Sequence, residues 1–110
     1  MDLGKGNLMN DGLDVAVNRS GGLIEVAATG EIDIATVEAF RQALHKAIFE
    51  TQRVVSVNLL EITFIGSVGI NSLVEARQLA IRHGKSFRVN KASRKVERVL
   101  ELMGMSDYFD

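Results

Sequence analysis

The sequence contains no cysteine, no proline and no tryptophan, and its charges almost balance. The absence of cysteine excludes disulfides, thiolate catalysis and cysteine-ligated zinc or iron–sulfur clusters. With 13 basic and 14 acidic side chains, the formal net charge is −1, which is unlike a protein that holds nucleic acid on a basic surface. No apolar run approaches the roughly 20 residues that a membrane-spanning helix needs. We therefore expect a cytoplasmic protein that neither binds nucleic acid nor inserts into a membrane.

The length and composition predict one globular domain. Residues 1–11 are rich in glycine and asparagine and contain no apolar segment, so we expect a flexible N-terminal tail rather than a signal peptide. Residues 12–110 are enough for one domain but not for two. Hydrophobic residues make up 46% of the chain and charged residues 25%, which is typical of a globular protein and not of a disordered one.

Four segments have the pattern of strands. Apolar residues alternate with polar or small ones over 13–17 and 23–28, and the glycine-containing turn between them favours a hairpin. A nearly continuous apolar segment at 54–60 predicts a strand at the centre of a sheet. The alternation returns at 86–89.

Three further segments have apolar residues at helical spacing. The first helix begins at Val37, the second runs from about Ser67 to His83, and the third follows Ser93, which can cap it. The residues expected on their buried faces are Val37, Phe40, Leu44, Ala47 and Ile48, then Ile70, Leu73, Val74, Ala80 and Ile81, and finally Val96, Val99, Leu100 and Met103. Tyr108 and Phe109 could add a last contact or a short strand.

The resulting order of elements is β-β-α-β-α-β-α. Strands that alternate with helices in the second half of the chain imply right-handed crossovers and parallel pairing there. The predicted fold is therefore α/β, with a mixed sheet of four to five strands and helices packed against it.

The segment Thr63-Phe-Ile-Gly-Ser-Val-Gly-Ile70 lies between the central strand and the second helix. In a structural interpretation, Ser67 caps the helix while the two glycines, Gly66 and Gly69, form the bend and permit close packing. In a regulatory interpretation, Ser67 carries a phosphate. The N–H groups and the macrodipole at a helix start favour negative charge, and phosphorylation would place about two negative charges on one surface position.

Two motifs, Gly30-Glu-Ile-Asp33 and Phe64-Ile-Gly-Ser-Val-Gly-Ile70, together with this order of elements, resemble the anti-sigma-factor antagonist family, a branch of the STAS domains. The family pattern is Gly-Glu-Leu-Asp or close to it at the first motif. At the second it is an aromatic or apolar pair followed by Asp-Ser-Ser/Thr-Gly-Leu-Gly. The resemblance extends from about residue 13 to residue 109, and it implies a single STAS-like domain over residues 12–110.

The resemblance also implies a function and a site. In the family, the unphosphorylated protein binds an anti-sigma factor with serine kinase activity and so releases the sigma factor. Phosphorylation of the serine abolishes this binding, and a phosphatase reverses it. The serine corresponds to Ser67, and the residues implied in partner docking are Asp33, Gly66, Ser67, Val68, Gly69 and Ile70. The residues themselves offer no catalytic motif or metal-ligand cluster, so we expect a protein that is not an enzyme and holds no cofactor or metal; we also expect it to be a monomer when free.

The sequence departs from the family pattern at two positions. Gly66 stands where the family has aspartate, and Val68 where it has serine or threonine. The missing carboxylate removes a hydrogen-bond acceptor beside Ser67, so a constitutively unphosphorylated antagonist is one alternative. Another is an accessory STAS subunit that binds the ATPase of a lipid ABC transporter.

Other residues receive plainer interpretations. Asp33 could simply cap the first helix. His45 and His83 have no paired carboxylate or second histidine nearby, so they supply neither a metal site nor the base that a nucleophilic Ser67 would need. The cluster of Arg94, Lys95 and Arg98 is interpreted as a solvated helix face rather than an anion site. A small-molecule sensor stays open as an alternative, because the sequence identifies no pocket residues.

Overall fold

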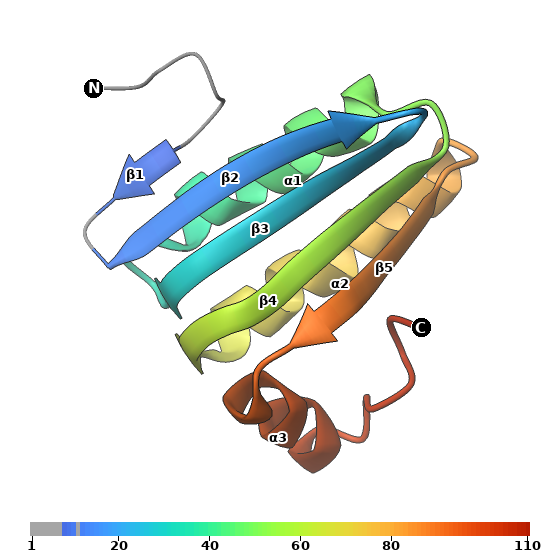
Figure 1. The fold of residues 1–110 in the computed structure, drawn as a ribbon. Helices are drawn as coiled ribbons and strands as arrows, with labels where there is room; N and C mark the ends of the chain where they lie inside the picture. The colour runs from blue at the N-terminus through green and yellow to red at the C-terminus, as the bar shows by residue number, and fades with distance from the viewer. Residues whose placement is uncertain (1–7, 11) are drawn as a thin grey trace.

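The computed structural model describes residues 8–10 and 12–110 (Figure 1). In chain order its elements are β1 (Leu8–Asn10), β2 (Leu13–Ser20), β3 (Leu23–Ile32), α1 (Val37–Glu50), β4 (Val54–Ile65), α2 (Ser67–Arg82), β5 (Ser86–Ala92) and α3 (Arg94–Leu102). The predicted order β-β-α-β-α-β-α is confirmed, with β1 added before it. The flexible tail predicted over residues 1–11 is wrong for residues 8–10, which pair with β2. Residues 1–7 and 11 lie outside the described residues.

All five strands of the described chain form one mixed sheet in the order β1-β2-β3-β4-β5. The first two pairings, β1–β2 and β2–β3, are antiparallel. The β3–β4 and β4–β5 pairings are parallel, as the alternation of strands and helices predicted. Each parallel pair is connected through a helix, and both helices, α1 and α2, lie on the same face of the sheet (Figure 1).

The hydrophobic core lies between the sheet and these two helices. All five α1 residues predicted to face inward are buried, and Phe40, Leu44 and Ile48 are fully enclosed. On α2, Ile70, Leu73 and Ala80 are buried as predicted, whereas Ile81 is 53% exposed. Successive residues of a helix point about 100° apart, so with Ala80 turned to the core Ile81 faces outward.

The third helix follows its prediction only in part. Ser93 caps it by accepting a hydrogen bond from the N–H of Val96 at 3.3 Å, and Val96 and Leu100 are buried. Met103, predicted to fill the core, is 44% exposed. The helix ends at Leu102, so Met103 lies at the C-cap, where the chain turns away toward Gly104.

The end of the chain returns to the sheet beyond α3. Phe109 is buried against Phe87, with ring centroids 6.3 Å apart, and its carbonyl accepts a hydrogen bond from the N–H of Val89. The guanidinium of Arg77 lies 4.7 Å from the centroid of the Tyr108 ring. Of the two alternatives predicted for these aromatic residues, the packing contact is therefore correct.

Across residues 8–10 and 12–110, the helices are all too short or too polar to cross a membrane.

Candidate functional site

The site lies at the C-terminal ends of the neighbouring strands β3 and β4 (Figure 1). The last residues of these parallel strands, Ile32 and Ile65, are register partners. The N–H of Gly66 donates to the carbonyl of Ile32 at 3.0 Å, which extends the pairing by one residue. The turn after β3, which contains Asp33, and the start of α2 at Ser67 are consequently neighbours. Ligands of sheets with parallel strands bind at this carboxyl edge.

Asp33 organises the turn between β3 and α1. Its Oδ1 accepts hydrogen bonds from the N–H groups of Ala35 at 2.9 Å and Thr36 at 3.1 Å. The Thr36 hydroxyl accepts from the N–H of Asp33 and donates to the carbonyl of Glu31. Thr36 is the N-cap residue of α1, but its side chain makes no capping bond. Asp33 therefore stabilises the turn that leads into the helix, and its half-buried side chain stays at the edge of the site.

The prediction that Ser67 caps α2 is wrong. The N-cap residue is Gly66, whose backbone is extended with φ −90° and ψ 178°, and no side chain provides a capping bond. The Gly66 carbonyl accepts from the N–H groups of Gly69 and Ile70. Because Gly66 is already in the extended conformation of an N-cap residue, Ser67 is the first residue inside the helix instead of its cap.

Ser67 is exposed at this helix start. Within the described part of the chain, no oxygen accepts a hydrogen bond from the N–H of Ser67 or Val68. The first turn of α2 contains no acidic residue. The helix dipole and the free N–H groups both favour a negatively charged group next to the Ser67 hydroxyl.

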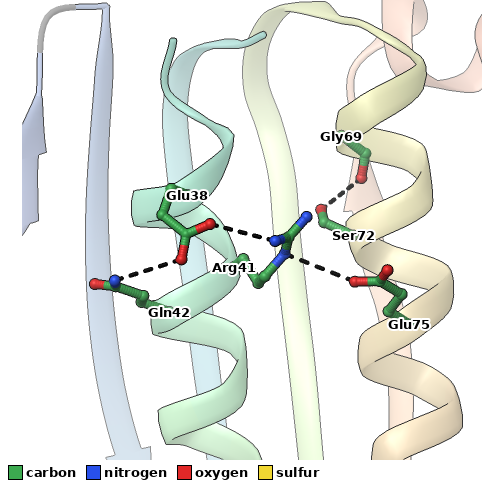
Figure 2. Close-up of polar contacts among 6 residues, drawn as sticks. All are labelled: Glu38, Arg41, Gln42, Gly69, Ser72 and Glu75. Atoms are coloured by element: carbon green, nitrogen blue, oxygen red, sulfur yellow. Dashed lines mark hydrogen bonds and ion pairs between the residues drawn. The ribbon is translucent and has the colours of Figure 1, made fainter. Parts of the chain in front are cut away.

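Gly69 and Ile70 lie beneath this exposed position. Ile70 is fully buried, and a Cβ on Gly69 would lie 2.7 Å from Cγ1 of Ile65 and 2.8 Å from Cγ2 of Ile32. Gly69 therefore allows the first turn of α2 to pack directly on the ends of β3 and β4. The buried Ser72 hydroxyl donates to the Gly69 carbonyl at 2.7 Å (Figure 2). These residues position Ser67 from the interior and cannot contact a partner with their own side chains.

The two helices that begin at the site are connected by charged side chains. Arg41 of α1 lies between Glu38 of its own helix and Glu75 of α2 (Figure 2). The distances are 3.3 Å from Nη1 to Glu38 and 3.6 Å from Nε to Glu75. Exposed pairs of this kind each contribute at most about 1 kcal/mol. They help to keep α1 and α2 side by side rather than creating a reactive group.

Two apolar side chains at the site are exposed, and the sequence analysis did not single them out. Ile34 is 84% exposed in the turn that Asp33 organises, and Phe64 is 49% exposed at the end of β4. The Phe64 ring lies 3.6 Å from the position that a Cβ on Gly66 would occupy. Exposed apolar groups beside polar ones are typical of a protein-docking surface, in which polar residues surround an apolar centre. The available signal for Ile34 was its position between Asp33 and Thr36, in a segment predicted to be a turn.

Within the described residues, metal-ligating side chains do not gather at the site. No group of three His, Asp or Glu residues in ranges 8–10 and 12–110 is arranged to hold a metal ion. His83 follows the far end of α2, about 24 Å along the helix axis from Ser67 at 1.5 Å per residue. Its ring packs instead against Phe49, with centroids 5.1 Å apart.

The comparison with known families decides the classification. The STAS domain family matches residues 14–110. The chain belongs to the STAS domain family. This STAS domain is 26% identical over 99 residues to the anti-sigma-F factor antagonist RsfB of Mycobacterium tuberculosis, an alignment that covers 90% of this chain and 80% of that protein.

Solved structures agree with this classification. The crystal structure of an anti-sigma factor antagonist from Mycobacterium paratuberculosis superposes with a TM-score of 0.80 at 25% identity, over 92% of this chain and 86% of that one. The anti-sigma factor antagonist SpoIIAA in its unphosphorylated form has the same fold, with a TM-score of 0.71 at 18% identity over 84% of this chain and 82% of its own. The predicted fold class and the family resemblance are confirmed.

Proposed function

We propose that this STAS domain is an anti-sigma-factor antagonist, and that it docks on an anti-sigma factor through the surface formed by the Asp33 turn and the start of α2. The observation that carries the proposal is the exposed Ser67 at the first position of α2. Exposed Ile34 and Phe64 beside it would supply apolar contact area. The function named for the relatives supports the same assignment.

The proposal includes a switch at Ser67. A partner with serine kinase activity would transfer the γ-phosphoryl group of ATP to the serine Oγ, with ADP as leaving group and loss of the hydroxyl proton. The fold would accommodate the phosphate, because Ser67 is exposed and the helix start favours an anion. The interface with the partner would not accommodate the phosphate, because about two strongly hydrated negative charges would have to be buried there. A phosphatase would restore docking.

In this proposal the site residues have two roles. Asp33, Gly66, Ser67 and Val68 lie at the surface or partly reach it and would contact the partner. Gly69 and Ile70 are buried and would hold the contacting residues in place. The free protein is proposed to be a cytoplasmic monomer with a binding role rather than a catalytic one.

The central test compares charge at Ser67 with charge elsewhere. We expect Ser67→Asp to weaken binding to the cognate anti-sigma factor about tenfold, equivalent to about 1.4 kcal/mol, because an unpaired carboxylate enters the interface. Ser67→Ala should bind like the wild-type protein. Isothermal titration calorimetry with anti-sigma factors from the source organism measures all three affinities.

Ser86→Asp is the matched control for this test. Ser86 is also an exposed serine, but it begins β5 at the opposite end of the sheet, so its substitution should leave binding unchanged. Equal affinities for the wild-type, Ser67→Asp and Ser67→Ala proteins would contradict the switch. Recovery of the chain with a transporter ATPase instead of an anti-sigma factor would favour the accessory-subunit alternative.

Gly66 provides a second test, because aspartate is the family residue at this position. The extended backbone of Gly66 suits any residue, and a Cβ there meets only ordinary contacts at 3.6 Å or more. Gly66→Asp should therefore fold, and as an N-cap residue aspartate should add a few tenths of a kcal/mol of stability. We expect it to increase the rate of phosphate transfer to Ser67, measured by mass spectrometry after incubation with partner and ATP. An unchanged rate in a Gly66→Asp protein that binds its partner normally would contradict a role for this carboxylate.

A further inference from the structure

A groove lies between the end of β4 and the helix α3. It encloses about 460 Å³, within the roughly 300–1,000 Å³ range of sites for small molecules. Its apolar lining comes from both elements, with Phe64 and Ile65 on β4 and Val99 and Leu102 on α3. Leu102 is 77% exposed, so its side chain is accessible to a molecule in the groove.

The charged side chains that line this groove in the described part of the chain are all positive. Among the described residues that line it, the charged ones are Arg94, Lys95 and Arg98, all exposed on α3. In the described part of the chain, none of the three forms an ion pair with a carboxylate. The carboxylates of the same helix, Glu97 and Glu101, line a different depression. The helix thus presents its cations to the groove and its acidic side chains elsewhere.

The placement of these cations is unfavourable for the helix itself. Arg94 and Lys95 occupy the first turn of α3, where the helix dipole disfavours positive charge by a few tenths of a kcal/mol or more. A bound anion would offset both this interaction and the mutual repulsion of the three cations. The interpretation of the three residues as a merely solvated helix face did not include the groove, because Phe64 and Ile65 reach it from a distant part of the sequence.

We propose that this groove binds an anionic amphiphile with a single alkyl chain and a carboxylate head group. The chain lies on Phe64, Ile65, Val99 and Leu102, and the head group pairs with the cations of α3. The groove shares Phe64 with the docking surface proposed above, but the proposal does not rest on that docking function. An acidic helical segment of a protein is a poorer fit, because helix-in-groove binding needs apolar anchors over two or more turns, and here the apolar lining is four side chains.

Decanoate below its micelle concentration is a suitable probe. Titration into the ¹⁵N-labelled full chain should produce saturable amide shifts at Phe64 and over residues 94–102, and none in the hairpin of β2 and β3. Decyltrimethylammonium, with the same chain and the opposite charge, should bind at least about tenfold more weakly, because the three cations repel it. Hexanoate should also bind more weakly than decanoate, because a shorter chain buries less apolar surface.

Variants separate the two parts of the proposed site. Arg98→Gln should lower the decanoate affinity about threefold, as expected for an exposed ion pair. Its matched control, Arg82→Gln, removes the same charge from the last turn of α2 and should leave the affinity unchanged. Leu102→Ser should weaken binding without unfolding the protein, because this side chain is mostly exposed.

Three results would overturn the proposal. The first is equal binding of the anionic and cationic probes. The second is decanoate shifts that spread evenly over the sheet. The third is saturable binding of a glutamate-rich amphipathic peptide to residues 94–102 together with no binding of decanoate. The last result would assign the groove to a protein segment instead.

Discussion

Gly30→Ala is expected to destabilise the protein by about 3 kcal/mol or more, from backbone strain together with a steric clash. Gly30 has φ +114°, a conformation that side-chain-bearing residues rarely adopt. A Cβ at this position would lie 2.1 Å from the carbonyl oxygen of Gly12. The same oxygen accepts a hydrogen bond from the N–H of Glu31 at 2.7 Å, so the two backbone segments cannot separate without losing that bond. Urea denaturation followed by circular dichroism measures the change.

Gly21→Ala is the control that separates strain from the clash. Gly21 also has a positive φ, +51°, but a Cβ there would meet no atom within 4 Å. This substitution should cost only about 1–2 kcal/mol, the strain of a left-handed backbone alone. Equal losses for both variants would contradict the importance of the close approach between Gly30 and Gly12. The glycine of the Gly30-Glu-Ile-Asp33 motif is therefore explained by the close approach of Gly12, the residue that precedes β2, to the end of β3.

Most of the fold could be predicted because it depends on local periodicity. The face of α1 repeats at helical spacing over its whole length, and the residues on it are buried. The predictions failed at the ends of elements and at residues whose structure depends on contacts with a distant segment of the chain. Three residues, Leu8–Asn10, are too few to show a period, and they form β1 only because β2 offers a free edge. Met103 continues the apolar spacing of α3 in sequence, but the helix has already ended.

The position of the candidate site could also be predicted, but not its details. The spacing placed the start of α2 at Ser67, and the structure agrees. The capping role of Ser67 was wrong because glycine at position 66 provides the extended conformation of an N-cap without a side-chain bond. The exposure of Phe64 and the groove beside α3 were not predictable, because both depend on how residues far apart in the sequence are placed against each other.

Gly69→Ala should destabilise the protein by about 2 kcal/mol and displace the start of α2. The added methyl group would lie within 2.8 Å of side-chain atoms of Ile65 and Ile32, both of which are buried and cannot move freely. Overpacking of this kind typically costs about 1–3 kcal/mol. Because the methyl group would clash with two buried side chains, we expect the upper end of this range, about 3 kcal/mol, which leaves a net loss of about 2 kcal/mol after the gain of about 1 kcal/mol that alanine offers over glycine in a helix. Thermal or urea unfolding measures the stability, and the amide shifts of Ser67 and Val68 report the displacement.

A double-mutant cycle tests the steric origin of this effect. Ile65→Ala removes the Cγ1 atom nearest to the added methyl group, so in that background Gly69→Ala should cost at least about 1 kcal/mol less than in the wild-type protein. Additive losses would show that the two residues do not compete for the same space. If the cycle confirms the contact, Gly69→Ala should also weaken partner docking, although no exposed side chain has changed. Gly66→Ala, whose Cβ would meet only ordinary contacts, should cost no more than about 1 kcal/mol through the poorer N-cap and leave the first turn of α2 in place.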